Sequence, residues 1–175
     1  MEKSLLNRNN FRLLIDKVPT VEYFVKSVNI PGLTFSEAVQ PAGLGLDAYF
    51  PGDKVVFESM TVNFLVDEDL ENFKEIYDWM NAIIPISKSA DFKQYTGSTS
   101  TTTGVSSGAT GLLSQYSDIT LVTNTNKNIP NRYFRFHDAF PISLSGLVLE
   151  SGADQEPATA TVEFRFTYYD IEITS

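Results

Sequence analysis

The sequence Thr161-Val-Glu-Phe-Arg-Phe-Thr-Tyr-Tyr-Asp-Ile-Glu-Ile173 decides the fold class of this chain. Val162, Phe164, Phe166 and Tyr168 alternate with mostly polar neighbours, which is the period of two of a β-strand with one apolar face. The pattern predicts one long strand over residues 158–173. Because a terminal segment is ordered only when it is tied down, we expect this strand to be held in a sheet. Its length leaves room to pair beyond its own subunit, which favours a structural building block over a catalyst.

Further elements are predicted along the rest of the chain. Apolar runs bounded by turn residues predict strands over residues 11–15, 21–28, 54–57, 59–66, 117–123, 132–138 and 142–150. One helix is expected to begin at Asp67, where three carboxylates favour a helix N-terminus, and to end at Pro85. Its apolar residues recur at three- and four-residue steps, and we interpret Trp79 as a packing residue. This set predicts a mainly β fold, a small barrel or two-sheet sandwich with one flanking α-helix.

Residues 33–53 are expected to be irregular, because prolines and glycines interrupt them. They nevertheless carry Leu44, Leu46, Tyr49 and Phe50, more large apolar side chains than an ordinary exposed loop holds. Two alternatives stay open. The segment is either a loop folded onto its own core or an arm that buries these side chains on a neighbouring molecule.

A second unusual segment, residues 95–115, is rich in Gly, Ser and Thr. It cannot bury enough apolar surface to offset its ordering entropy, so it is predicted to be a flexible loop. The chain after it is too short to fold separately. We therefore expect one domain over residues 1–175.

The composition narrows the possible partners. The chain has 22 Asp and Glu against 13 Lys and Arg, a formal net charge of −9. A nucleic-acid binder normally has the opposite sign, although DNA could pass such a surface without sticking. The absence of cysteine excludes disulfides and thiolate metal sites. With no signal sequence and no apolar run long enough for a bilayer, we expect a soluble protein without stable membrane association.

No catalytic, metal or cofactor site is predicted. His137 and Asp138 are neighbours on a strand, so their side chains should point to opposite faces. The carboxylates of residues 67–71 lack the spacing and the central glycine of a calcium-binding loop. We find none of the common nucleophile, zinc or phosphate-binding motifs.

Three blocks of sequence occur in a characteristic order. The first is Asn10-Phe-Arg-Leu-Leu-Ile-Asp16 with Val25-Lys-Ser-Val-Asn-Ile-Pro-Gly32. The second is Pro51-Gly-Asp-Lys54, then Met60-Thr-Val-Asn-Phe-Leu-Val-Asp-Glu-Asp69 and the helix through Tyr77-Asp-Trp79. The third is Phe140-Pro-Ile-Ser-Leu-Ser-Gly146 with Tyr168-Tyr-Asp170. In this order they resemble the tail tube proteins of contractile-tailed bacteriophages, which are related to the tube proteins of contractile injection systems.

The resemblance implies a structural virion protein of the tail, assembled in the host cytoplasm. Hexameric rings would stack into an inner tube and conduct the genome through the host envelope. The implied partners are other copies of the chain, the tail sheath, a tape measure protein in the lumen, the baseplate hub or initiator, and the tail terminator. DNA would only pass through. The contact candidates between subunits or rings are Leu44, Leu46, Tyr49, Phe50, Phe166 and Tyr168.

Two other functions are weighed against this one. The chain could be a baseplate, tube-initiator or tail-completion ring protein of the same fold. It could also be a carbohydrate-binding β module, in which Tyr49, Tyr95, Tyr116 and Tyr169 stack on sugars.

Overall fold

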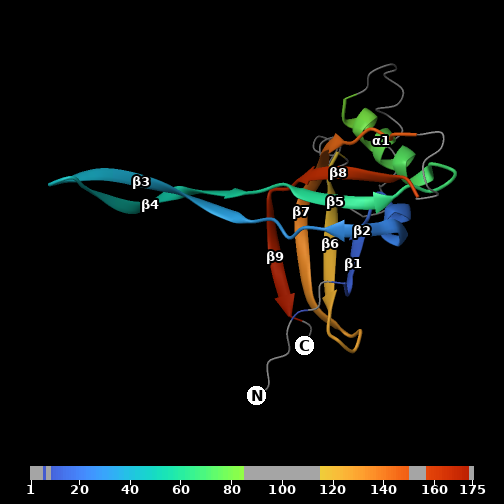
Figure 1. Ribbon diagram of the computed structural model, residues 1–175, viewed down its shortest axis with the longest axis horizontal. Helices are drawn as coiled ribbons and strands as arrows, with labels where there is room; N and C mark the ends of the chain where they lie inside the picture. The colour runs from blue at the N-terminus through green and yellow to red at the C-terminus, as the bar shows by residue number, and fades with distance from the viewer. Residues whose placement is uncertain (1–5, 7–8, 85–114, 150–156, 174–175) are drawn as a thin grey trace, which may run out of the picture.

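A computed structural model describes residue 6 and residues 9–84, 115–149 and 157–173 (Figure 1). These residues are mainly β-structure with one α-helix, as the sequence predicted. The elements are β1 (Phe11–Ile15), the 3-10 helix η1 (Pro19–Phe24), β2 (Val25–Val28), β3 (Leu33–Gly43), β4 (Leu46–Phe57), β5 (Met60–Leu65), α1 (Glu71–Ile83), β6 (Ser117–Asn124), β7 (Pro130–Leu144), β8 (Thr159–Arg165) and β9 (Tyr168–Ile173).

Seven strands form one bent antiparallel sheet in the order β1-β6-β7-β8-β5-β2, with β9 also paired to β7. The long strand β7 belongs to both halves. Its residues 132–137 pair with β9 and residues 140–144 pair with β8. We call β1, β6, the first part of β7 and β9 half-sheet A. The second part of β7, β8, β5 and β2 form half-sheet B.

The bend in β7 corrects one prediction. The sequence predicted two strands, residues 132–138 and 142–150, but β7 continues through Asp138 to Leu144. Asp138 has a positive φ of 55°, which turns the strand without ending it. Residues 145–149 are not in a strand.

The terminal segment is also two strands instead of one. β8 ends at Arg165 and β9 begins at Tyr168, and β9 continues along the same edge of β7, where Arg165 pairs with Phe140 and Tyr168 with His137. The turn at residues 166–167 changes which side chains face inward. Tyr169 packs against Phe136 with ring centroids 5.3 Å apart, whereas Tyr168 is exposed. The predicted shared apolar face of Phe166 and Tyr168 is therefore wrong.

The core lies between the two half-sheets and α1. The alternating residues of β5 and β8 point into it, as their period of two predicted. Its largest fully buried side chains are Trp79, Phe64, Phe136, Phe164, Leu13, Met60, Ile76, Ile119, Leu121, Val18, Val21 and Val62.

Helix α1 covers part of this core. Trp79 is fully buried beside Phe164, and its Nε1 donates a hydrogen bond to the Gln115 carbonyl at 3.0 Å, so its predicted packing role is confirmed. The predicted acidic cap is wrong, because α1 begins after Leu70 with no side-chain cap. Instead, the buried Asn72 accepts a hydrogen bond from the Asp67 N–H and donates one to the Leu65 carbonyl.

Two further predictions need correction. Residues 21–28 are not one strand, because Pro19 opens a 3-10 helix and only residues 25–28 form β2. Residues 33–53 are not irregular. They form most of β3 and β4, a separate two-stranded hairpin that projects far from the rest of the molecule (Figure 1). We call this hairpin the arm.

The Gly/Ser/Thr-rich loop predicted over residues 95–115 lies outside the described residues except for Gln115. None of the helices among the described residues has the length and apolar character that a membrane span requires.

Candidate assembly surfaces

The arm exposes its apolar side chains instead of burying them. Leu44, Leu46, Tyr49 and Phe50, all predicted contact residues, are 104%, 70%, 66% and 50% exposed. The same holds for other large apolar residues along both strands: Leu33, Phe35, Val39, Val55 and Val56. The alternative of a loop folded onto its own core is therefore wrong. So many exposed apolar side chains on one projecting hairpin indicate an interaction site.

The tip of the arm presents a leucine in a strained conformation. Gly43, Leu44 and Gly45 all have positive φ, at 81°, 57° and 78°. Glycine adopts this region freely, but a leucine there has an unfavourable contact between its Cβ and the backbone. Strain of this kind is retained where the exposed side chain has a use outside the local fold.

The base of the arm is fixed to the rest of the molecule, the bent seven-stranded sheet with α1, which we call the barrel. The Phe57 ring lies 5.7 Å from Phe166 and 5.4 Å from Tyr169, and the Arg165 Nη1 donates to the Phe57 carbonyl at 3.0 Å. Within the arm, Ser36 forms a bulge whose Oγ accepts a hydrogen bond from the Lys54 N–H at 3.1 Å. A Cβ on Gly52 would collide with Ser36, so this position requires glycine. These contacts hold the base of the arm, so the hairpin points away from the barrel in a defined direction.

Half-sheet A has two open edges. Among the described residues, β1 pairs only with β6 and β9 pairs only with β7. Figure 1 shows β1 and β9 on opposite sides of this half-sheet, with the arm projecting past the β9 side. Unpaired strand edges are templates for pairing with another chain. Half-sheet A thus has two different open edges, and the arm projects beside one of them.

The two predicted contact residues of the terminal segment lie in different environments. Phe166 is half-buried, with its ring 5.0 Å from Phe136 in the aromatic cluster under the arm. Tyr168 is 44% exposed on the outer face of half-sheet A, and its ring stacks on His137 at 4.6 Å. Only Tyr168 is well placed to touch another molecule directly.

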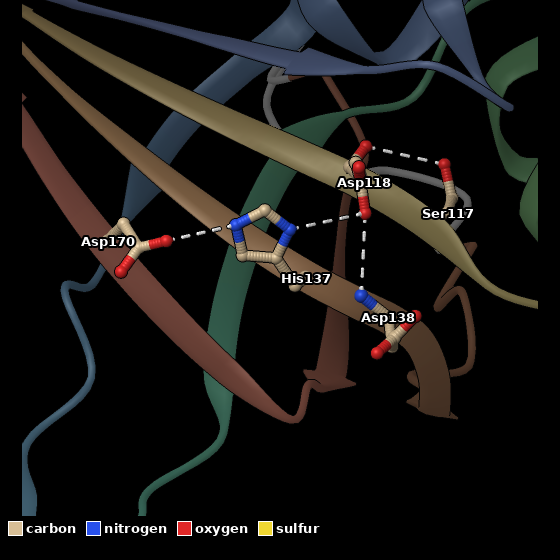
Figure 2. Close-up of polar contacts among 5 residues, drawn as sticks. All are labelled: Ser117, Asp118, His137, Asp138 and Asp170. Atoms are coloured by element: carbon tan, nitrogen blue, oxygen red, sulfur yellow. Dashed lines mark hydrogen bonds and ion pairs between the residues drawn. The ribbon is translucent and has the colours of Figure 1, made fainter.

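His137 lies at the centre of a polar cluster that spans three strands (Figure 2). Its Nε2 is 3.3 Å from Asp170 Oδ2 on β9, and its Nδ1 is 4.0 Å from Asp118 Oδ1 on β6. The Asp138 carboxylate points away from His137, as predicted, although its backbone N–H donates to Asp118. Both imidazole nitrogens face carboxylates, so neither faces a hydroxyl that it could activate. The cluster therefore joins side chains of three neighbouring strands, β6, β7 and β9.

This cluster was not predicted from the sequence, because its members are far apart along the chain and are brought together only by the register of the sheet. Thr120 and Asp170 both pair with Arg135, which places β6 and β9 on either side of the same part of β7. The outer face of half-sheet A also carries the ion pair Arg135–Glu172 at 3.1 Å. Within the described ranges no group of His, Asp and Glu is arranged to hold a metal ion.

The tyrosines proposed for sugar stacking do not share one surface. The Tyr116 ring packs edge-on against Phe140 at 5.7 Å, and Tyr169 lies within the aromatic cluster. Tyr49 is on the arm, and Tyr95 lies outside the described residues. The described tyrosines therefore form no common platform.

Comparisons with known proteins identify the family of the chain and structures with a similar fold. The family model described as phage tail tube protein matches residues 5–172. No curated protein sequence matches the chain. One similar solved structure is the sheath-tube complex of an extracellular contractile injection system in the extended state, at 13% identity and a TM-score of 0.57, covering 97% of this chain and 93% of that one. Another is the tube-terminating cap of the anti-feeding prophage, at 11% identity and a TM-score of 0.58, covering 99% and 95%.

Because the family model covers nearly the whole chain, the protein belongs to the phage tail tube protein family. Its role is that of a structural component of a virion tail.

Proposed function

We propose that copies of this chain close into a hexameric ring in which β9 of one copy pairs with β1 of the next. Every neighbouring pair in half-sheet A is antiparallel, so β1 and β9 run in opposite directions. Copies related by rotation about a ring axis would then meet as an antiparallel pair. Such a head-to-tail contact uses two different surfaces, and it gives a closed ring when the rotation closes.

The side chains of the two edges are complementary on both faces. On the outer face, β9 presents Asp170 and Glu172, and β1 presents the exposed Arg12. On the inner face, β9 presents the exposed Ile171 and β1 presents the half-buried Phe11. Opposite charges and apolar pairs across neighbouring strands stabilise a sheet. The two open and complementary edges of half-sheet A are the observation that carries the proposal.

The arm would join one ring to the next. Its two strands of 11 and 12 residues reach about 35 Å at the usual rise per residue, well beyond a single neighbouring strand. Leu44, Leu46, Tyr49 and Phe50 are its proposed contact residues, because they are apolar, exposed and near the tip. Burying them on another copy would explain why they are retained on a free projection.

The mechanism is mechanical. Stacked rings form a rigid conduit that a contracting sheath drives through the host envelope, and this subunit breaks no covalent bond. The polar outer face of half-sheet A would line the lumen, where a tape measure protein and then DNA pass. The net charge of −9 would repel DNA and keep it from binding. Baseplate and terminator proteins would cover the two ends of the tube.

Electron microscopy of the purified protein over a concentration series tests this proposal. Rings and stacked tubes are expected at high concentration, and a protein that stays monomeric at every concentration would contradict it. Replacing residues 36–53 with a short turn should leave a folded subunit that forms rings but no longer stacks. Tubes made by that variant would reject the role of the arm.

A second candidate is a terminal or initiating ring of the same fold. The tube-terminating cap and the sheath-tube complex match the chain equally well, with TM-scores of 0.58 and 0.57. The number of copies in intact particles separates the two functions. A repeating tube requires many stacked rings, whereas a terminal protein requires only one or two.

A further inference from the structure

The bent sheet leaves a groove open between its two ends, β1 of half-sheet A and β2 of half-sheet B. The groove has a volume of about 830 Å³. Its wall is mostly apolar and includes Leu6, Phe11, Val25, Val28, Ile30 and Leu121. Val28 is half-buried and Ile30 is 42% exposed, so the core does not fill this space. Strand pairing along β1 alone would leave the groove empty.

We infer that the groove receives Ile171 and Ile173 from β9 of the neighbouring copy in the ring. This inference rests on the ring proposed above and adds an apolar contact to its backbone pairing. Ile171 and Ile173 are 57% and 69% exposed, although they lie on the same face of β9 as Tyr169, which is partly buried against the core. They continue the inward-facing row of β9 past the end of its own core.

Position and chemistry favour this occupant. The groove begins at β1, the strand that β9 of the next copy would pair with, so the inward-facing side chains of that β9 would point to its opening. Phe11 and Leu13 face the groove from β1, on the same face as the incoming isoleucines. Arg12 and Glu22 at the rim form an ion pair with each other at 3.7 Å. Lys26, Ser27 and Thr123 add polar atoms to the lining, but most of its surface is apolar.

The arm of a second copy is a poorer fit to the same groove. Its tip lies about 35 Å from its base, whereas the groove of the next copy would begin directly beside β9. The arm therefore reaches past the groove, and its exposed residues remain available for stacking.

The first test substitutes the isoleucines. Ile171→Asp and Ile173→Asp should each raise the protein concentration needed for ring formation by about tenfold or more, because each loses the burial of one large apolar side chain. Native mass spectrometry over a concentration series measures this. Ile129→Asp is the matched control, because Ile129 is 57% exposed on the β6–β7 turn. Unchanged ring formation by both isoleucine variants would overturn the inference.

A second test locates the contact. The chain has no cysteine, so engineered pairs can be joined without a background. A short bismaleimide should link a subunit that carries Ile173→Cys to one that carries Leu6→Cys. It should likewise link Ile171→Cys to Ile30→Cys, because antiparallel pairing places the end of β9 beside the start of β1. A third pair, Asp170→Cys with Arg12→Cys, reports edge pairing alone.

The edge pair and the two groove pairs together separate failure of the inference from failure of the ring. Linkage of the edge pair without the groove pairs would leave the ring intact and overturn the groove contact. Linkage of Leu44→Cys to Ile30→Cys in place of the β9 residues would also overturn it, by placing the arm in the groove. Absence of rings and of every link would reject the proposed function itself.

Discussion

The barrel and the arm use the same kinds of apolar residues in opposite ways. In the barrel, Trp79, Phe64 and Phe164 have no exposed surface, whereas Phe35, Tyr49 and Leu44 on the arm are 60%, 66% and 104% exposed. The barrel has three layers to bury its side chains between, but a two-stranded ribbon has no second layer. A hairpin alone is marginally stable in water. We therefore expect the barrel to fold by itself and propose that the arm is completed by another molecule.

The largest expected effect comes from truncating the barrel core. Phe164→Ala should lower the free energy of unfolding by about 3–5 kcal/mol, because it leaves a cavity beside Trp79. Phe35→Ala on the arm is the matched control and should change the free energy of unfolding of the monomer by no more than about 0.5 kcal/mol. Urea unfolding below the assembly concentration measures both. Equal losses would break the distinction between the two regions.

A smaller effect is expected at the tip of the arm. Leu44→Asn introduces a residue that tolerates positive φ better than leucine does, which relieves part of the strain. The local opening free energy of the arm should therefore rise by up to about 1 kcal/mol. Tube stacking should nevertheless weaken, because the apolar side chain is gone. Hydrogen exchange of arm amides and electron microscopy provide the two readouts. A variant that stacks as well as the wild type would show that Leu44 is not a contact residue.

The smallest effect concerns Lys17, at the edge of the core. Burial lowers the pKa of Lys17 from 10.5 to about 8. Between these pH values the unfolded chain binds more protons than the folded chain, so stability should rise as pH increases from about 8 towards 10.5, and this gain is lost as pH falls through 8. Lys17 is only partly buried, and its Nζ lies 5.3 Å from the centre of the Trp79 ring, which favours the charged form. We therefore expect this rise in the free energy of unfolding to be less than about 1 kcal/mol.

Lys17→Met removes this titration and serves as the comparison for the pH series. The stability of the variant should rise less than that of the wild type over the same pH range, with Trp79 fluorescence as the probe. Identical pH profiles for the two proteins would contradict the assigned cause.

Local pattern was sufficient to predict the barrel core. The period of two in β5 and β8 and the helical spacing of α1 are direct consequences of burying one face, so the sequence shows them. The turn at residues 166–167 and the bend at Asp138 depend on pairing with distant strands, and the sequence did not reveal them. The contacts of His137 with Asp118 and Asp170 depend on register for the same reason.

The arm is a region where the sequence pattern predicted the wrong secondary structure. Its prolines and glycines suggested irregular structure, yet each is accommodated in a two-stranded ribbon whose edges are free. Its exposed Leu44, Leu46, Tyr49 and Phe50 were correctly identified as unusual for a loop. What they contact is a property of the assembly, which a single chain does not contain.

Hydrogen exchange of the protein below and above its assembly concentration tests the central claim most directly. If open edges are completed by other copies, amides of β1 and β9 should become protected when rings form, and arm amides when rings stack. Amides of β5 and β8, which already have two partner strands or lie within the core, should change little. Rings that form without added protection of β1 and β9 would contradict the account.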